Sequence, residues 1–207
     1  MTEDKNELYA KVDEFLASTI RAVRELQVSG IVPSVHQAVE AICSSKGKVI
    51  CSGLGKAGIA AKKAAATFSS LGIPACYLHP ADASHGDIGI VCPGDVLLAF
   101  STSGKTREVI ETIELSRHLG VGKVIAITSH PDSPVRRLSD LTIDMGVITE
   151  AGHLHIAPTT SIVVMLVISD MIATICSSRK GMTMQNYGSR HHGGYIGALA
   201  RGDGIIR

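Results

Sequence analysis

Apolar residues recur along the chain with two different spacings. In residues 7–26 they fall at every third or fourth position, which is the spacing of one face of a helix. Other runs are short and mostly apolar, and they are rich in β-branched residues, as in KVICSG at 48–53 and KVIAITS at 123–129. Runs of this second kind indicate strands that are buried on both faces.

The two patterns alternate over most of the chain. Strands are expected at 48–53, 74–80, 95–101, 123–129 and 141–146, and helices at 7–26, 35–43, 56–72, 106–120, 133–139 and 157–181. This alternation predicts an α/β fold, here a three-layer sandwich with a five-stranded parallel sheet of the doubly wound, flavodoxin-like type. Ligands of such folds bind at the carboxyl ends of the strands. The site is therefore expected in the loops at 52–58, 79–87, 101–107 and 129–134.

The length and composition fit one globular domain. The chain has 207 residues, 45% of them hydrophobic, and it contains no internal repeat, low-complexity tract or long linker. We expect a single domain over residues 1–207, with an N-terminal helical segment and a glycine-rich C-terminal tail at 187–207. A net charge of +1, the lack of a basic run and an aromatic content of 3% argue against nucleic acid and anionic membranes as partners.

The sequence also favours a cytoplasmic location. The N-terminal segment MTEDKNELYAK is polar and charged, unlike a signal peptide. The longest apolar stretch, 156–175, contains Pro158 and Asp170 and is expected to form a buried helix rather than a membrane span. The five cysteines are scattered and form no C-x-x-C pair, which is typical of free thiols in a reducing compartment.

The segment STSGKT at 101–106 ends like a nucleotide-binding P-loop, but the first glycine of that loop is missing. Ala99, inside a predicted strand, occupies its position, so the loop cannot wrap a β-phosphate. The segment still joins a strand to a helix and carries four hydroxyl residues, where ordinary capping needs one. The residues that could bind a phosphate monoester here are Ser101, Thr102, Ser103, Gly104 and Thr106. We interpret the loop as a phosphate cradle.

A second glycine-rich loop, GLGKAG at 53–58, fits the G-x-G-x-x-G pattern of dinucleotide-binding folds. That pattern alone is weak, because the next strand ends in Leu78-His79-Pro80 and the nearest acid, Asp82, follows a proline. Lys56 is more informative. A cation at the start of a helix opposes the helix dipole, which indicates that this lysine has a ligand.

Histidines and acids cluster in three further segments: HPADASHGDIG at 79–89, TEAGHLHIAPTTS at 149–161 and SRHHGG at 189–194. Together these segments offer a possible metal set: His79, Asp82, His85, Asp87, Glu150, His153, His155, His191 and His192. However, an H-x-H spacing has low specificity for metals, and no pair is spaced i, i+4 on a clear helix. Metal-free acid/base chemistry by glutamate and histidine is the alternative.

Taken in order, these segments resemble the sugar isomerase (SIS) family, and within it the D-arabinose 5-phosphate isomerases. GLGKAG is similar to the family's GxGKSG loop, HPADASHGDIG to HPxEAxHGDLG, EAGHLHIAPTTS to EACPxxLAPTSS, and SRHHGGYIG to SHPGGALG. The resemblance covers nearly the whole chain. It implies the SIS fold, a homotetramer, and interconversion of D-ribulose 5-phosphate and D-arabinose 5-phosphate. In that family the product supplies Kdo, an acid sugar used in lipopolysaccharide or capsule.

The resemblance also implies roles for individual residues. Glu150 is expected to be the leading base and His191 the second acid/base group, while Lys56 stabilises negative charge and His85 contacts substrate. The substrate- and phosphate-binding residues are expected to be Ser52, Gly53, Gly55, His79, Ser101, Thr102, Ser103, Gly104, Thr106 and Thr159. Neither a metal ion nor another cofactor is expected to be required. Because active sites in related folds often borrow residues across subunits, we expect the tail that carries His191 to act as such an arm.

Three features depart from the family's pattern. Lys105 stands where family members often carry a glutamate, and the nearest acid is Glu108. His192 stands in place of a proline. Many family members continue into a pair of regulatory CBS domains, whereas this chain ends at Arg207, so we expect that regulation to be absent. We expect control at the active-site cleft instead, by an end product such as CMP-activated Kdo.

Two other interpretations remain open at this stage. Phosphoheptose and hexulose phosphate isomerases share the fold, although the HPxxAxHGD segment favours the arabinose type. SIS modules also bind sugar phosphates without turnover in regulators, which usually carry a DNA-binding helical domain. The N-terminal segment here is short and of mixed charge, and both Glu150 and His191 are present, so an enzyme is favoured.

Overall fold

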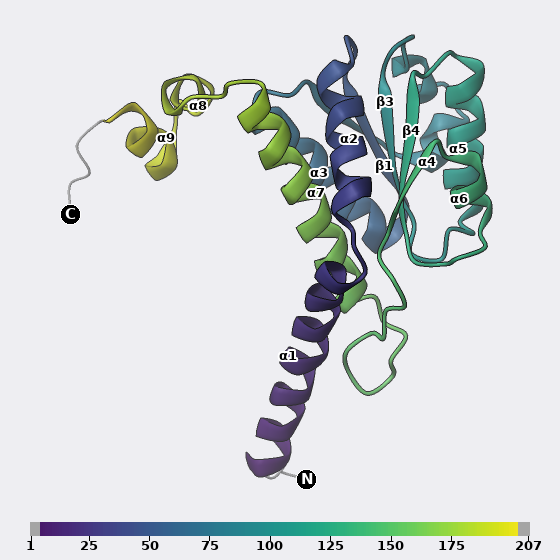
Figure 1. Ribbon diagram of the computed structural model, residues 1–207, viewed down its shortest axis with the longest axis vertical. Coiled ribbons are helices and arrows are strands. Elements are labelled where there is room, and N and C mark those ends of the chain that lie inside the picture. Colours follow the sequence, from purple (N-terminus) through teal and green to yellow (C-terminus); the bar gives the residue numbers. More distant parts are fainter. Residues whose placement is uncertain (1–4, 203–207) are drawn as a thin grey trace.

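The computed structural model describes residues 5–202; residues 1–4 and 203–207, the two ends of the predicted domain, lie outside this range. Its centre is a parallel five-stranded sheet in the order β2-β1-β3-β4-β5 (Figure 1). The strands are β1 (Val49–Gly53), β2 (Ala75–Leu78), β3 (Val96–Phe100), β4 (Lys123–Thr128) and β5 (Leu141–Asp144). The predicted α/β fold is therefore confirmed, and each strand falls within the range expected from its apolar run.

Helices cover both faces of the sheet. One layer contains α2 (Val32–Ser44), α3 (Gly55–Ser70) and α7 (Thr160–Arg179), and the other contains α4 (Pro80–Ala83), the 3₁₀ turn η1 (Asp87–Ile90), α5 (Arg107–His118) and α6 (Pro134–Leu138). Successive strand residues face opposite layers. In β1, Val49 and Cys51 pack in the first layer, while Ile50 packs in the second. Burial on both faces explains why the strands are apolar throughout.

Helix α7 confirms the expectation of a buried apolar helix. By length and composition it could cross a membrane, the only such helix within residues 5–202, yet 56% of its most apolar window is buried inside the protein. Its residues Val164, Met165, Ile168 and Ile172 are fully buried in the core with α2 and α3. Packing between two helices therefore accounts for its hydrophobicity.

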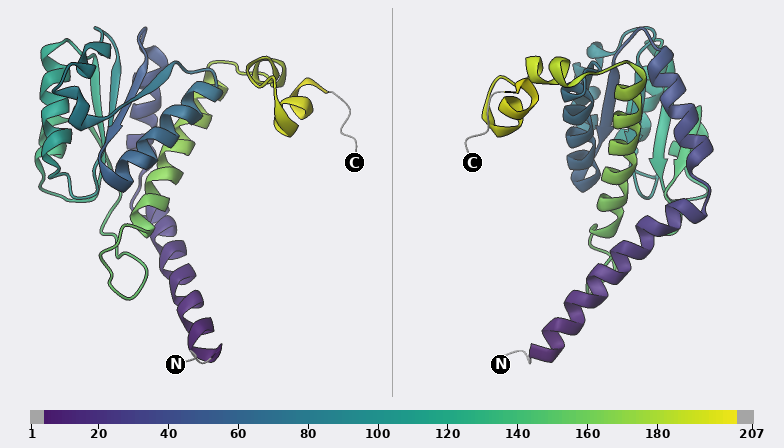
Figure 2. Two further views of the ribbon diagram at one scale, coloured as in Figure 1. Left: turned by 180° about the vertical axis from the view of Figure 1, so that it is seen from behind. Right: turned by 60° about the vertical axis from the view of Figure 1, so that its left-hand side comes forward.

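Two terminal segments extend away from this body (Figures 1 and 2). Helix α1 (Lys5–Val28) has the expected periodicity, but only its last turns are buried, through Ala22 and Leu26. The tail, for which the sequence predicted no regular elements, contains α8 (Met184–Arg190) and α9 (Gly194–Arg201). We refer to residues 184–201 as the α8–α9 arm. Both segments present surface that the body of the chain does not cover.

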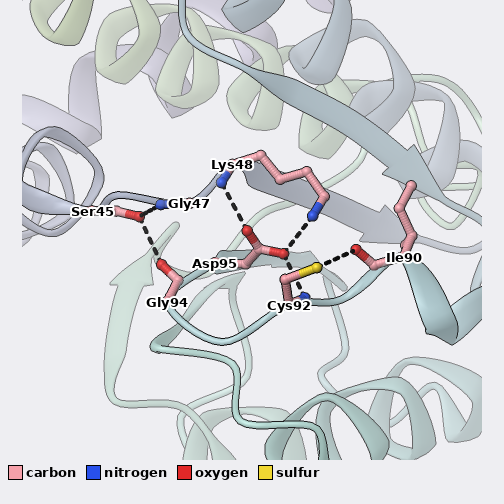
Figure 3. Close-up of polar contacts among 7 residues, drawn as sticks. All are labelled: Ser45, Gly47, Lys48, Ile90, Cys92, Gly94 and Asp95. Carbon is pink, nitrogen blue, oxygen red and sulfur yellow. Dashed lines mark hydrogen bonds and ion pairs between the residues drawn. The ribbon is translucent and has the colours of Figure 1, made fainter.

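The amino-terminal edge of the sheet is held by Asp95, whose side chain is only 2% exposed. Its carboxylate accepts hydrogen bonds from the backbone N–H of Lys48 at 2.8 Å, from Lys48 Nζ at 2.6 Å and from the backbone N–H of Cys92 at 2.8 Å (Figure 3). A Cβ on Gly47 would lie 2.4 Å from Asp95 Oδ1, so only glycine fits beside it. The cluster joins the chain entering β1 to the chain entering β3.

We expect Asp95→Asn to lower the free energy of unfolding by about 2–4 kcal/mol at neutral pH, since it removes the charge of a buried, hydrogen-bonded pair. Burial alone would raise the pKa of Asp95, but the hydrogen bonds from Lys48 and Cys92 outweigh it and hold the pKa below the ordinary 3.8. The stabilisation is therefore complete above about pH 4 and is lost as the pH falls through the lower folded pKa.

Chemical denaturation of both proteins from pH 7 to about pH 3 measures this difference. The difference in free energy of unfolding between wild type and Asp95→Asn should become smaller in the acidic part of the range. Asp13→Asn, at an exposed position on α1, is the matched control and should behave as wild type throughout. A gap that stays constant with pH would show that the lost stability does not come from the carboxylate charge.

Candidate active site at the carboxyl edge of the sheet

The loops after β1 and β3 and the segment leading into α7 surround a pocket of about 210 Å³. Five of the predicted site residues line it: Lys56, Ser101, Thr102, Ser103 and Thr106. Pro158 and Ile162 close the side nearest α7. The pocket thus lies at the carboxyl edge of the sheet, where the fold class predicts ligands to bind.

The phosphate loop is organised by its own hydroxyl groups. Ser101 Oγ lies 3.1 Å from Thr106 Oγ1 and accepts a hydrogen bond from the backbone N–H of Gly104 at 3.1 Å. Gly104 has a φ of +61°, and a Cβ there would lie 2.2 Å from Ser133 Oγ in the β4–α6 loop. Both the conformation and the space therefore require glycine, and the neighbouring loop fixes the shape of the cradle.

Two buried serine hydroxyls near this edge, Ser52 Oγ and Ser129 Oγ, have no hydrogen-bond partner within residues 5–202. Ser52 is the second-last residue of β1 and Ser129 follows β4, whereas Ser116 Oγ, which also has no partner, lies away on α5. Buried polar groups are normally paired, so two unpaired hydroxyls at one edge indicate groups that bind ligand or water. Ser129 was not among the predicted site residues, although its loop was.

Tyr77 connects the β1 and β2 loops. Its hydroxyl donates to the carbonyl oxygen of Gly53 at 2.9 Å, and its ring lies edge-to-face with His79. Burial raises the pKa of Tyr77, and the charge of Asp82 adds to this. A Cβ on Gly58 would lie 2.4 Å from Gly53 O, so Gly58 allows α3 to approach β1. Gly53 and Gly58 of GLGKAG thus serve close packing of strand and helix, whereas Gly55 has a φ of +60° and open space around it.

The charged residues around the pocket differ in their surroundings. Lys56 lines the pocket, and Lys105 lies beside it on the phosphate loop; neither ammonium group forms an ion pair within residues 5–202. Lys105 is exposed, and its backbone N–H donates to Ser103 Oγ at 3.2 Å. His85 is exposed after α4, whereas His79 Nδ1 lies 3.4 Å from Asp82 Oδ2. Lys56 is therefore the predicted cation that the structure places at the pocket.

Glu150 is buried, at 8% exposure, and caps the start of α7. Its Oε2 accepts hydrogen bonds from the backbone N–H groups of Thr159 at 2.9 Å and Ser161 at 3.0 Å, and both hydroxyls also donate to the carboxylate. A carboxylate at this position satisfies free N–H groups of the helix and complements its dipole. The predicted base and the predicted substrate residue Thr159 are therefore in direct contact.

His191 does not reach this region in the same chain. Glu150 contacts the first turn of α7, whereas His191 follows α8, beyond the far end of α7 (Figures 1 and 2). With 20 residues and a rise of 1.5 Å per residue, α7 is about 30 Å long. A single chain thus holds the two predicted acid/base groups at opposite ends of this helix.

The structure gives no support to a metal set built on the histidine segments. Within residues 5–202, no three side chains of histidine, cysteine, aspartate or glutamate converge as ligands. His155 instead places Nδ1 at 3.1 Å from the carbonyl oxygen of Glu150, with a φ of +51°. A larger hollow of about 330 Å³ lies between α1 and the loop at 147–155, but it contains none of the predicted site residues.

Comparison with known proteins identifies the family. Residues 42–175 match the model of the SIS domain. The chain belongs to the SIS domain family. Among its relatives, the arabinose 5-phosphate isomerase KdsD of Pseudomonas aeruginosa is 39% identical over 161 residues, which cover 78% of this chain and 49% of KdsD. The chain spans about half the length of the curated relatives it matches.

Solved structures of SIS proteins match over almost the whole chain. Protein c3406 of E. coli CFT073, in complex with arabinose 5-phosphate, is 33% identical with a TM-score of 0.86, and the match covers 91% of this chain and 100% of c3406. A Bacteroides fragilis protein assigned as a phosphosugar isomerase involved in capsule formation is 41% identical with the same TM-score, covering 91% and 99%. The SIS-domain match over residues 42–175 includes the segments that form the pocket.

Proposed function

We propose that this SIS domain interconverts D-ribulose 5-phosphate and D-arabinose 5-phosphate. The observation that carries the proposal is the pocket itself: a hydroxyl-rich loop between β3 and α5, next to Lys56, with unpartnered Ser52 and Ser129 hydroxyls at the same edge. Hydroxyl and backbone N–H groups at a helix N-terminus suit a phosphate monoester. The similarity to c3406, whose structure contains arabinose 5-phosphate, and to KdsD supports this choice of sugar.

The reaction needs two proton transfers, one between carbons and one between oxygens, and we assign them to Glu150 of one subunit and His191 of a neighbouring subunit. Glu150 takes a proton from C1 of ribulose 5-phosphate, and the C1–H electrons form the enediolate C1–C2 double bond while charge moves to the C2 oxygen. Lys56 stabilises that charge. His191 moves a proton from the C1 oxygen to the C2 oxygen, and Glu150 returns its proton to C2. The phosphate loop holds the other end of the sugar, so the reacting carbons stay in place.

The four hydrogen bonds to Glu150 are compatible with this role only if substrate replaces one of them. Two donors are rotatable hydroxyls, on Thr159 and Ser161, and the Thr159 hydroxyl also lies 3.1 Å from the carbonyl oxygen of Ala151. Turning the Ser161 hydroxyl away exposes Oε1 of the carboxylate, while the two backbone N–H groups keep Oε2 fixed.

Turnover of a panel of sugar phosphates tests the proposal. The panel contains ribulose 5-phosphate, a hexulose 6-phosphate and a heptulose 7-phosphate, each assayed with and without a chelator, because we propose that no metal or other cofactor is needed. We expect arabinose 5-phosphate from ribulose 5-phosphate, with exchange of the C1 proton into solvent. Binding of the sugar without turnover would indicate a sensor instead of an enzyme. Faster turnover of the hexulose or heptulose phosphate would show that the longer sugar, and not ribulose 5-phosphate, is the substrate.

We further propose that the protein is a cytoplasmic homotetramer in which the α8–α9 arm completes the active site of a neighbouring subunit. The uncovered face of α1 supports the assembly, since five large apolar side chains there are between 42% and 52% exposed: Leu8, Val12, Phe15, Leu16 and Ile20. The separation of His191 from Glu150 supports exchange of the arm. The five cysteines are unpaired, which fits a reducing compartment. Light scattering measures the mass in solution.

The place of the reaction in metabolism is also a proposal. Arabinose 5-phosphate would supply Kdo for lipopolysaccharide or capsule, and the similarity to the B. fragilis protein of capsule formation favours capsule. CMP-activated Kdo would then compete at the active-site cleft. Calorimetry should detect its binding, and no heat at about millimolar nucleotide sugar would exclude an inhibitor of useful affinity.

A further inference from the structure

The α8–α9 arm forms a compact unit around the turn that carries His191. The two helices pack closely because each has a glycine where the other helix approaches it. A Cβ on Gly197 would lie 1.9 Å from the carbonyl oxygen of His191, and one on Gly188 would lie 3.0 Å from Arg201 Cγ. Arg201 Nη1 also donates to His191 O at 2.8 Å. The backbone of His191 is therefore fixed within the arm itself, without help from the body of the chain.

The side chain of His191 is fixed as well, by one residue. Its ring stacks on Tyr187, with centroids 4.0 Å apart and planes inclined by 17°. Its Nδ1 lies 2.9 Å from the carbonyl oxygen of Tyr187. A carbonyl can only accept, so the hydrogen of a neutral His191 belongs on Nδ1, and Nε2 keeps its lone pair. Within residues 5–202, Nε2 has no hydrogen-bond partner.

The neighbouring His192 lacks all of these restraints. It is exposed, and its ring forms no hydrogen bond or ring contact within the part of the chain that the structure describes. The sequence alone could not rank the two adjacent histidines by their surroundings. The structure does so, since only His191 has its ring plane and its tautomer defined before any ligand or second subunit is bound.

We propose that Tyr187 is the positioning residue of His191, and this rests on the proposed isomerase function. Its ring sets the plane of the imidazole, and its carbonyl oxygen retains the hydrogen on Nδ1. Nε2 is thereby presented as the atom that exchanges a proton with the sugar. Tyr187 does not touch substrate; it acts through the orientation and the tautomer of His191.

Tyr187→Leu tests the stacking in the full-length protein. We expect kcat to fall about tenfold with KM almost unchanged, because the histidine is still present but less often oriented. Tyr187→Phe keeps the ring and should restore most of the activity. Tyr9→Leu is the matched control, because Tyr9 is a 65%-exposed tyrosine outside the arm, and it should leave both constants unchanged. A rise in KM without a change in kcat would overturn the proposal, and so would an equal loss of kcat in the leucine and phenylalanine variants.

The tautomer can be measured independently of turnover. In protein labelled with ¹⁵N-histidine, long-range ¹H–¹⁵N spectra at about pH 8, where an ordinary histidine is neutral, distinguish hydrogen on Nδ1 from hydrogen on Nε2. The signal of His191 is the one lost in His191→Gln. We expect the Nδ1–H form in wild type and Tyr187→Phe, and a mixture in Tyr187→Leu.

The two readouts separate the possible failures. A wild-type His191 with hydrogen on Nε2 overturns the inference whatever the activity, and needs no variant to fold. If no sugar phosphate is turned over while the Nδ1–H form is found and is lost in Tyr187→Leu, the geometry stands and the isomerase function fails. Wild-type kcat in Tyr187→Leu overturns the positioning role.

Discussion

Glu150→Gln is expected to lower kcat for ribulose 5-phosphate isomerisation by about 10²- to 10⁴-fold, the usual contribution of a general base. Glutamine has nearly the shape of glutamate, and its amide oxygen can still accept from the backbone N–H groups of Thr159 and Ser161. Its NH₂ group can donate to the Ser161 hydroxyl instead of accepting from it. The substitution thus removes the base and largely keeps the cap.

The cap makes a second measurement necessary. Loss of the negative charge at the start of α7 should cost about 1 kcal/mol in the free energy of unfolding. A variant that lost activity only because α7 had loosened would show a larger loss of stability and a raised KM. Denaturant unfolding and steady-state kinetics on the same protein therefore distinguish a chemical role of Glu150 from a structural one.

Ser161→Ala is the matched control for the cap. It removes one hydroxyl donor from the Glu150 carboxylate but leaves the carboxylate in place. We expect it to lose about 1 kcal/mol of stability, as for a lost cap hydrogen bond, and to keep kcat within about one order of magnitude. Should Glu150→Gln turn over like wild type while being destabilised, Glu150 would be a helix cap alone, and the base would have to be another group.

The strands and the loops at their carboxyl ends could be predicted because the signal is local. A short run such as 124–127 is apolar at every position because helices cover both faces of the sheet, and a hydroxyl-rich loop follows β3 directly. The part of the site formed by Lys56 and the phosphate loop therefore follows from the order of elements alone. The direct contact between the β3 and β4 loops follows from the same order, because β3 and β4 are neighbours.

The parts that could not be predicted depend on contacts between distant residues. Glu150 caps a helix that begins ten residues later, beyond the reach of any local capping pattern. The helices of the arm lie in a glycine-rich segment, a composition that disfavours helices, and they are held by the close approach at Gly188 and Gly197. The apolar face of α1 predicted a helix correctly, but periodicity cannot show whether the chain itself covers that face.

A mixture of Glu150→Gln and His191→Gln chains is expected to regain activity that neither variant has alone. Each variant should lose about 10²- to 10⁴-fold in kcat, since each lacks one acid/base group. If Glu150 of one subunit works with His191 of a neighbour, random mixing at equal amounts leaves about a quarter of the sites with both groups intact, as expected for a symmetric assembly with exchanged arms. If both groups came from one chain, no intact site would form.

The mixed oligomers can be prepared by co-expressing the two variants with different tags and purifying through both. Activity per site near a quarter of that of the wild type supports exchange of the arm, since intact sites can then form only between two different chains. The same conclusion is expected from the length of α7, which separates Glu150 from His191 by about 30 Å within one chain. Each variant co-expressed with a differently tagged copy of itself is the control for the effect of the tags. Activity no higher than the average of the two parents would place His191 outside the neighbour's site, and the α8–α9 arm would then have a structural role in assembly instead.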